Sequence, residues 1–585
     1  MEIRTHSTSS SALSSLPKGS VQACQNCKGD FVIEKEDFSF YEKIKVPSPT
    51  WCPECRLIRR LLWRNEHSLF RRPNSTPGST GEHISIYHPD SKFTTYDREY
   101  WWSDKWDPCD FGMDYDFNKP FFQQFKELLE RIPHVALFDS KSVNARFCNY
   151  TVEQKNCYLV SGAWASEDCM FCNRMAGGKF TLDSYITFNT EFSYENVYCN
   201  DSSKLFFSRE SENCLDSYFL YDCRNCSDCI LSTNLRNKSY CIENIQYSRE
   251  EYLKKKNELA LNTRSGIVNA KKKFRELWQS AIHKHLKLTN TDNVVGDHVS
   301  DARNCYQIFD VKDVIENTKY ANWGGKGLRD SYDVGPGCGD NSELTYESVG
   351  VGVQDNRVFF GATVWYSHEI LYGYMVTNSH NCFGCVGIDK KQYCILNKQY
   401  TKKEYENLVP QIIEQMKNMP YIDKNGKSYA FGEFFPPEIS PFSYNETVAQ
   451  DYFPLSRDSV KDKGFSWREY TLGSYQTTIN GKDLPETITE VGDNIMNEVI
   501  ECEITGRPFK ILEQELNFYR RFNLPLPSIH PDERHNERLK LRNPMVLRKR
   551  MCYFGDKEID TTYLPENEGG PKKVVCAEHY NKEVY

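Results

Sequence analysis

Short apolar segments separated by polar turn residues dominate the middle of the chain. Segments such as Asn156-Cys-Tyr-Leu-Val160, Ser184-Tyr-Ile-Thr-Phe188 and Thr363-Val-Trp365 recur roughly every ten to fifteen residues, with Asn, Asp, Ser and Gly between them. Such spacing is typical of a β-solenoid, in which each short strand stacks on its counterpart one coil away. The pattern therefore predicts two β-solenoid-like halves, residues 145–261 and 301–420.

An internal repeat supports the division into two halves. The segment from Tyr240 to Tyr252 reappears from Tyr393 to Tyr405, 153 residues later. In each copy a hydroxyl residue, Ser248 or Thr401, precedes a glutamate by three positions, which is the pattern of a capping box. Each half is therefore expected to end in a helix that begins just after this hydroxyl residue.

Most of the 23 cysteines lie within these short apolar segments. Free cysteine behaves as a small hydrophobe and suits a narrow interior. The cysteines predicted to stack inside the halves are Cys157, Cys199, Cys214, Cys241, Cys305 and Cys394. The run Cys223, Cys226 and Cys229 has a spacing that could also hold a metal, but no fourth ligand stands out, and a structural role is the favoured interpretation.

Four cysteines near the N-terminus have metal-ligand spacing. Cys24 and Cys27 form one pair, Cys52 and Cys55 form the other, and 24 residues separate the pairs. Two residues between paired cysteines let both thiolates reach one tetrahedral ion, and a closed four-sulfur site is structural rather than catalytic. We predict a structural zinc site on a treble-clef or zinc-ribbon unit, with a short hairpin between the pairs and a helix after Cys55.

Basic and aromatic residues near the two ends are candidates for nucleic-acid contact. The candidate phosphate contacts are Arg56, Arg59, Arg60, Arg548, Lys549 and Arg550. The alternative is that these side chains are solvated surface charges. The candidates for base stacking are Trp101, Trp102 and Trp106. A role as anchors in the core is the favoured interpretation of these tryptophans.

The C-terminal part combines predicted helices with a second set of potential metal ligands. Residues 513–522 and 531–550 have helical patterns, and Asn543-Pro544 fits a helix start. Cys576 and His579 have ligand spacing, whereas Gly555 stands where a partner of Cys552 is expected. Adding Cys502 as a fourth ligand gives a degenerate zinc ribbon that binds zinc weakly or not at all.

These features predict a mixed α+β multidomain protein. The predicted segments are a disordered tail (1–22), a zinc-ribbon or treble-clef domain (23–72), a degenerate second ribbon with a helix (73–144), the first β-solenoid half (145–261), a helical linker (262–300), the second half (301–420), a Pro- and aromatic-rich packing segment (421–500) and a basic, helical, degenerate zinc-ribbon domain (501–585).

Composition narrows the class of protein. An aromatic content of 14% argues for a folded chain, and a net charge of -8 excludes a simple polycation. We expect no membrane-spanning helix, since the chain has no run of about 18 apolar residues. The N-terminus lacks an apolar segment of signal-peptide type, and cysteines in such a chain are expected to be free thiols or metal ligands more often than disulfides. A reducing location is therefore expected, either the cytoplasm or a virion assembled there.

No catalytic motif is evident. Nucleophile elbows, phosphate loops and HExxH are missing from the sequence. A β-helix enzyme acting on polysaccharide needs paired carboxylates on one exposed face. Candidates by residue type alone are Asp201, Glu210, Glu212 and Asp216.

Several longer strings resemble one family of proteins. They are Trp101-Trp-Ser-Asp-Lys-Trp-Asp107, Phe434-Phe-Pro-Pro-Glu438, Tyr444-Asn-Glu-Thr-Val-Ala-Gln450 and His530-Pro-Asp-Glu-Arg-His535. They are similar to uncharacterised zinc-ribbon, cysteine-rich repeat proteins of candidate-phyla-radiation bacteria, with relatives in giant DNA viruses. The resemblance implies zinc ribbons at both ends and a cysteine-rich repetitive middle, with no established activity. This chain departs from the family where Asp97 and Tyr100 replace an expected cysteine pair.

The leading hypothesis is a zinc-binding scaffold or interaction protein without catalytic activity, which contacts an unknown protein partner and no membrane. One alternative is nucleic-acid binding through the basic residues beside the zinc ribbons. A third, less favoured, is a carbohydrate-active β-helix enzyme.

Overall fold

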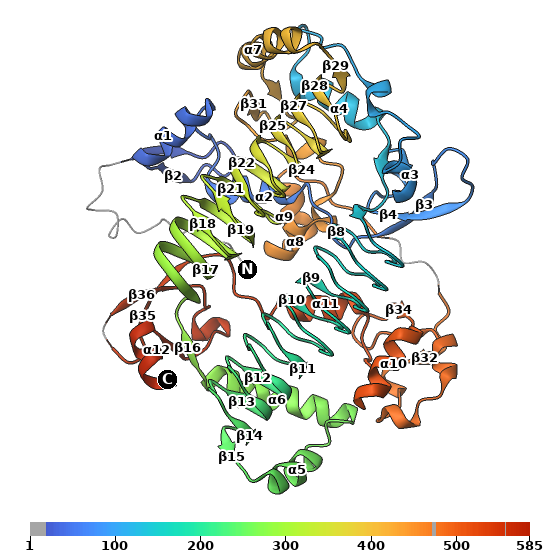
Figure 1. Ribbon diagram of the computed structural model, residues 1–585, viewed down its shortest axis with the longest axis vertical. Coiled ribbons are helices and arrows are strands. Elements are labelled where there is room, and N and C mark those ends of the chain that lie inside the picture. The colour runs from blue at the N-terminus through green and yellow to red at the C-terminus, as the bar shows by residue number, and fades with distance from the viewer. Residues whose placement is uncertain (1–18, 471–474, 556) are drawn as a thin grey trace. The chain divides into compact units, whose positions relative to one another are not determined.

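The computed structural model describes residues 19–470, 475–555 and 557–585, and shows a mixed α and β fold (Figure 1). The tail predicted for residues 1–22 lies mostly outside these residues. Contacts divide the chain into two compact units. Unit 1 comprises the described residues up to Ala136 together with Lys287–Arg468, and unit 2 comprises Leu137–Leu286 and Glu469–Tyr585. Each unit is therefore built from two separate stretches of sequence.

Unit 2 contains a stack of short parallel strands. They are β7 (Asp139–Ser140), β8 (Thr151–Val152), β9 (Asn173–Ala176), β10 (Tyr185–Phe188), β11 (Ser203–Phe206), β12 (Leu215–Tyr221), β13 (Ser227–Thr233) and β14 (Ser239–Ile242). The paired residues of successive circuits lie 12 positions apart and pair in parallel, as Tyr185 does with Val197 and Cys229 with Cys241. One circuit of the chain therefore takes 12 residues.

A three-residue period shapes each circuit. From Lys141 to Tyr240, every third residue has a positive φ, so the backbone bends at regular intervals. The residue after each bend points inward, and between Ser142 and Cys241 these inward positions are mainly Ser, Thr, Cys, Ala, Val or Leu. Asn and Asp, which tolerate positive φ better than most residues, recur at the bends. The narrow interior explains why so many cysteines lie in this part of the chain.

Unit 1 contains the second stack. Its strands are β17 (Leu288–Lys312), β18 (Ile315–Glu316), β19 (Lys319–Gly325), β20 (Leu328–Arg329), β21 (Tyr332–Val334), β22 (Ser342–Val351), β23 (Asn356–Phe359), β24 (Ala362–Trp365), β25 (His368–Leu371), β26 (Tyr374–Thr377), β27 (His380–Phe383) and β28 (Gln392–Ile395). The first six form a closed circuit of parallel pairings, and the later ones pair at offsets of 12 residues.

Both stacks end in the same way, as the repeat predicts. A short antiparallel strand, β15 (Ile245–Gln246) or β29 (Lys398–Gln399), folds back on the last parallel strand. A helix follows, α5 (Arg249–Glu258) or α7 (Lys402–Asn418). The capping boxes at Ser248 and Thr401 are confirmed, because each hydroxyl accepts from the glutamate N–H three residues on at 3.3 Å.

The N-terminal part of unit 1 is built from small elements around the cysteine pairs. They are β1 (Ser20–Ala23), β2 (Asp30–Ile33), α1 (Lys35–Ile44), α2 (Pro53–Leu61), β3 (Phe70–Pro73), β4 (Glu82–Ser85), β5 (Thr95–Tyr96), α3 (Arg98–Trp101), η1 (Pro108–Phe111), α4 (Phe121–Arg131) and β6 (His134–Val135). The hairpin predicted between the cysteine pairs is wrong. The hairpin, β1–β2, encloses the first pair instead, and a capping box at Glu34 starts helix α1 where the hairpin was expected.

The rest of unit 1 follows helix α7. Its elements are β30 (Tyr421–Ile422), β31 (Ser428–Tyr429), η2 (Pro437–Ile439), η3 (Tyr444–Glu446), α8 (Val448–Tyr452) and α9 (Arg457–Asp462). Phe434 and Phe435 of this segment are fully buried, and the Phe435 ring lies 4.5 Å from that of Trp63 and 4.7 Å from that of Phe125. The aromatic-rich segment thus packs against α2 and α4.

Unit 2 has further helices and strands outside its stack, and these elements correct three predictions. They are α6 (Arg264–Ser280), β16 (Ile282–Lys284), β32 (Ile479–Asn480), η4 (Gly481–Asp483), η5 (Ile488–Glu490), η6 (Asp493–Asn497), β33 (Ile500–Glu501), β34 (Pro508–Phe509), α10 (Glu513–Phe522), α11 (Pro531–Leu539), β35 (Arg548–Met551), β36 (Glu558–Thr561), η7 (Glu566–Glu568), β37 (Lys573–Val575) and α12 (Ala577–Val584). The linker helix ends at Ser280, and β17 of unit 1 begins at Leu288 rather than after residue 300. Helix α11 ends at Leu539, so Asn543-Pro544 starts no helix, and Arg548–Met551 is a strand.

Candidate metal centre

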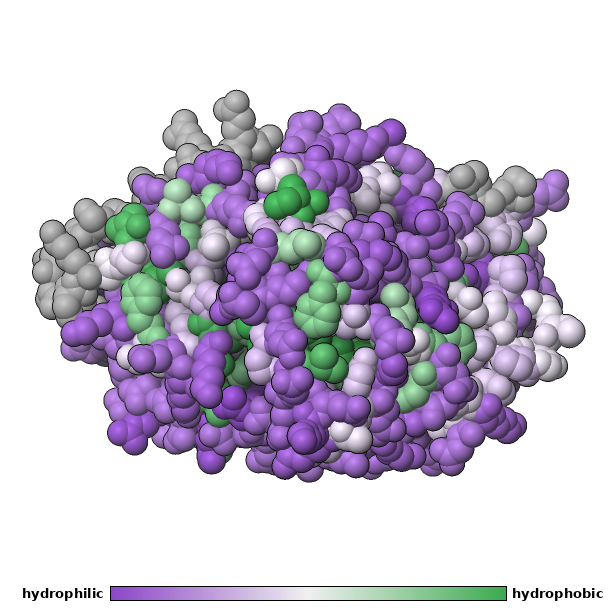
Figure 2. Space-filling view, turned by 90° about the horizontal axis from the view of Figure 1, so that it is seen from above, coloured by the Kyte–Doolittle hydropathy of each residue, from purple (hydrophilic) through white to green (hydrophobic). Residues whose placement is uncertain are grey.

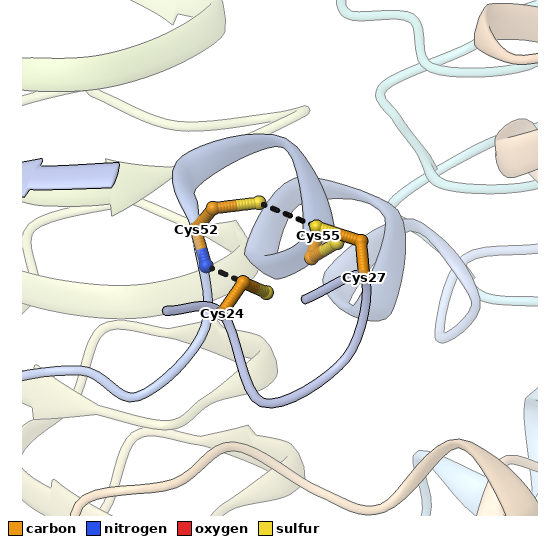
Figure 3. A group of neighbouring side chains, drawn as sticks. All are labelled: Cys24, Cys27, Cys52 and Cys55. Carbon is orange, nitrogen blue, oxygen red and sulfur yellow. Dashed lines mark hydrogen bonds between the residues drawn. The ribbon is translucent and has the colours of Figure 1, made fainter. Parts of the chain in front are cut away.

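The four N-terminal cysteines converge on one point (Figure 3). Their Sγ atoms all lie within 4.8 Å of one another, which is the spacing expected of ligands around one tetrahedral ion. Cys24 and Cys55 are buried, Cys52 is half-buried and Cys27 is exposed. A group of four thiols with no other ligand type fits zinc, and the predicted set of site residues is brought together as a whole.

Backbone hydrogen bonds hold the two cysteine turns in place. The Cys24 amide donates to the Gly29 carbonyl at 2.9 Å, and the Lys28 amide donates to the Cys24 carbonyl at 3.0 Å. The Cys52 amide donates to the Cys24 sulfur at 3.2 Å, so the second turn is attached directly to the first. Hydrogen bonds from the neighbouring thiols of Cys52 and Cys55 lower the pKa of Cys24 well below its usual range. The same contacts raise the pKa of Cys52 and of Cys55, so one cysteine of the group is favoured as a thiolate, the form that binds metal.

Helix α2 begins at the metal centre and is anchored to the strand stack of unit 1 by three buried arginines. Cys52 is its N-cap residue and Pro53 its first helical residue. Arg56 contacts the carboxylate of Asp333 at 2.8 and 3.0 Å, and Arg60 contacts the other oxygen of Asp333 at 3.0 Å. Arg59 pairs with Glu347 of β22 and, at 2.7 Å, with Glu433.

These contacts correct the prediction that Arg56, Arg59 and Arg60 could reach phosphates. Their exposed fractions are 2%, 0% and 0%, so they are neither solvated surface charges nor accessible to a nucleic acid. Buried charges need partners, and three carboxylates supply them. Of the basic residues near the C-terminus, Lys549 is exposed and pairs with Asp560 at 3.0 Å.

Unit 2 contains a second copy of the cysteine-turn and helix arrangement. Residues 502–538 match residues 24–60 at a constant offset of 478: Cys502 corresponds to Cys24, Phe518-Tyr519 to Phe40-Tyr41, and His530-Pro531 to Cys52-Pro53. The backbone geometry repeats as well. The Cys502 amide donates to the Arg507 carbonyl at 2.9 Å, and the His530 amide donates to the Cys502 sulfur at 3.3 Å.

The arginine contacts are also repeated in unit 2, whereas the metal ligands are not. Arg534 and Arg538, which correspond to Arg56 and Arg60, both contact Asp183, at 2.6 and 2.8 Å. The four positions equivalent to the N-terminal cysteines hold Cys502, Thr505, His530 and Glu533. Among the described residues these side chains do not form a group at ligand distance. The helix of unit 2 is therefore held by ion pairs without a four-thiol centre.

The second predicted zinc site is corrected by this arrangement. Cys552, Cys576 and His579 do come together, with the His579 Nδ1 atom 3.1 Å from the Cys552 sulfur and 3.4 Å from the Cys576 sulfur. Cys502 is not part of this group, because it belongs to the separate turn at His530. Three ligands at metal-binding distance remain, with Gly555 beside His579.

The corresponding place in unit 1 holds hydrogen-bonding side chains where unit 2 has cysteines. There, Asp97 accepts hydrogen bonds from Asn74 at 2.7 Å and from His83 at 2.9 Å. Asn74 follows β3 as Cys552 follows β35, and Asp97 precedes α3 as Cys576 precedes α12. Hydrogen bonds between polar side chains thus stand in place of a metal-binding group. The candidate metal centre of unit 1 lies at its cysteine turns, whereas that of unit 2 lies at Cys552, Cys576 and His579.

The cysteines of the stacks form a buried core. Cys199, Cys214, Cys223, Cys226, Cys229 and Cys241 pack in one cluster with Leu205 and Leu220. Cys157, Cys305 and Cys394 are likewise buried, as predicted. Sulfurs such as those of Cys226 and Cys229 donate to the carbonyl two residues earlier, each at 3.3 Å. No three of them form a ligand group in the part of the chain that the structure describes.

Three of the four carboxylates considered for polysaccharide chemistry make polar contacts within the stack. Asp201 accepts from Asn189 at 2.9 Å, Asp216 pairs with Lys204 at 3.3 Å, and Glu212 pairs with Arg224. Glu210 is 8% exposed.

Comparison with protein-family models and with curated proteins found no match to this chain. Among the described residues, no helix combines the length and apolar character that crossing a bilayer requires.

Proposed function

We propose that this protein is a zinc-stabilised scaffold without catalytic activity, in which treble-clef or zinc-ribbon modules brace two β-solenoids. The observation that carries the proposal is the connection from Cys52, a ligand of the candidate centre, through helix α2 to the buried carboxylates of the stack. A structural zinc ion contributes on the order of 10 kcal/mol to the folding of such small modules. Loss of the ion should therefore loosen α2 from the stack.

The exposed surface is mostly polar. The face in Figure 2 is mostly hydrophilic, and hydrophobic residues form only small separate groups on it. Large apolar patches usually mark obligate interfaces. We propose that an unidentified protein partner binds the polar faces of the solenoids, and that the protein acts in the cytoplasm or in a virion.

Limited proteolysis of the Cys52→Ser/Cys55→Ser variant tests the proposal. The expected result is rapid cleavage within residues 19–72 while unit 2 fragments persist. The control is Cys502→Ser, which changes the cysteine of the unit 2 turn that lacks a four-thiol group and should leave cleavage unchanged. Wild-type resistance in the double variant would contradict the zinc-stabilised scaffold.

Nucleic-acid binding is the weaker alternative, because three of its six candidate contacts are buried. Arg548, Lys549 and Arg550 remain its candidates. Fluorescence anisotropy with single- and double-stranded nucleic acid, titrated with salt, distinguishes the two. Nucleic-acid binding would be favoured if the affinity falls steeply with salt and the Lys549→Glu substitution abolishes the binding.

A further inference from the structure

A hollow lined by tryptophans lies in unit 1, away from the four-cysteine centre. Its volume is about 440 Å³, within the range of about 300–1,000 Å³ that small-molecule sites occupy. The aromatic part of the wall is formed by Trp101, Trp102 and Trp106. The opposite part comes from Gly387, Asp389, Lys390 and Lys391, which precede β28 of the stack.

Hydrogen bonds hold the tryptophan loop in a defined shape. The Trp106 indole donates to the Trp101 carbonyl at 2.8 Å. Asp107 accepts from the Cys109 amide at 2.8 Å and contacts Lys391 at 2.5 Å, which ties the loop to the stack. The rings of Trp101 and Trp102 are perpendicular, with centroids 4.7 Å apart, so their faces point in different directions.

Polar side chains of both kinds surround the tryptophans. The carboxylates are those of Asp104, Asp107, Asp110 and Asp389, and the ammonium groups those of Lys105, Lys390 and Lys391. Carboxylates only accept hydrogen bonds and ammonium groups only donate them. A site for a cation would be lined by hydrogen-bond acceptors alone, and a site for an anion by donors alone. A ligand with several hydroxyl groups, each able to donate and accept, matches the mixed lining.

The hollow is not a general consequence of the scaffold, because unit 2 fills the equivalent place. There α12 continues for eight residues, whereas α3 stops at Trp101 after four. Tyr580, at the position of Trp101, bonds to Asp222 and Arg236, and Arg236 lies 4.7 Å from the centroid of the Tyr585 ring. Asp389 stands where unit 2 has Arg236.

We propose that this hollow binds a sugar ring of a neutral oligosaccharide. An apolar C–H face of the sugar stacks on Trp102 or Trp106, both of which are half-buried, while its hydroxyl groups bond to the surrounding carboxylates and lysines. The indole nitrogen of Trp101 is buried and has no hydrogen-bond partner among the described residues. The site is independent of metal binding and of catalysis.

Tryptophan fluorescence of the full chain, titrated with hexamers of β-1,4-glucose, β-1,4-N-acetylglucosamine and α-1,6-mannose, tests the proposal. Saturable binding of at least one hexamer is expected. Trp102→Ala should weaken it about tenfold or more, as truncation of a stacking aromatic does, and Lys390→Ala should weaken it less. Tyr366→Ala removes an exposed aromatic outside the hollow and should leave binding unchanged. Circular dichroism verifies that each variant is folded.

Three outcomes overturn the proposal. In the first, none of the three hexamers binds at millimolar concentration. In the second, the folded Trp102→Ala and Lys390→Ala variants bind equally well. In the third, the protein responds to tetramethylammonium or to polygalacturonate and not to the neutral hexamers.

Discussion

The guanidinium of Arg56 and the carboxylate of Asp333 meet at 2.8 and 3.0 Å, and neither side chain is more than 2% exposed. The two residues lie 277 positions apart, yet the same carboxylate also receives Arg60. Because Arg56 directly follows Cys55, the geometry of the cysteine turn determines where the arginine enters the stack. The candidate metal centre and the packing of the strand stack are linked through this contact.

Replacing Asp333 should therefore destabilise unit 1. The Asp333→Asn variant leaves two arginines buried beside a neutral amide, and removing one partner of a buried ion pair costs about 3–5 kcal/mol. The free energy of unfolding in urea measures the loss. The control is Asp330→Asn, which removes a partly exposed pair with Lys43 and should change stability by less than about 1 kcal/mol. Equal effects of the two substitutions would contradict the role of the buried pair.

Replacing Asp183, the equivalent carboxylate of unit 2, should lower the free energy of unfolding by a smaller amount. In Asp183→Asn, Arg534 retains Glu515 at 3.1 Å, so less charge is left without a partner. We expect a loss of about 2–4 kcal/mol in the urea unfolding of unit 2, with unit 1 unchanged. Exposed Asp201→Asn serves as the control. A larger loss than in Asp333→Asn would show that Glu515 does not share the charge.

Acid should weaken unit 1 through His134. Burial lowers the pKa of this histidine to about 4, although its Nε2 atom lies 2.7 Å from the Leu129 carbonyl. Above pH about 6.5 the ring is neutral in both the folded and unfolded states. As the pH falls from there toward 4, the unfolded state takes up the proton first, so folding stability is lost by about 1.4 kcal/mol per pH unit.

Unfolding at pH 7.5 and pH 5 measures this effect. The His134→Gln variant lacks the titrating ring and should lose about 2 kcal/mol less than the wild type over that interval. Identical pH dependence in the two proteins would show that His134 is protonated as readily in the folded chain as in the unfolded one.

The local features of this protein could be predicted from short sequence patterns. The spacing of Cys24, Cys27, Cys52 and Cys55 identified the metal group, and the Ser248 and Thr401 capping boxes located two helices. Each depends on residues a few positions apart or on ligand chemistry, which sequence displays directly. The stacked cysteines followed from the size and polarity of a thiol.

The long-range contacts could not be predicted in this way. Arg56 and Arg60 looked like surface charges because their partner, Asp333, lies more than 270 residues away. Cys502 was assigned to the wrong group since a metal site was expected to have four ligands. The sequence does contain the information needed to place Cys502. Residues 24–60 match residues 502–538, and this match assigns Cys502 to the turn at His530. The three-residue spacing of small residues from Ser142 to Cys241 likewise marks the 12-residue circuit.

We propose that the four N-terminal cysteines hold one zinc ion. X-ray absorption at the zinc edge, on the Cys552→Ser/Cys576→Ser variant so that the C-terminal group does not contribute, tests it most directly. We expect about one zinc per chain with four sulfur neighbours at about 2.3 Å. A variant that contains no zinc, or zinc surrounded mainly by nitrogen and oxygen, would contradict it.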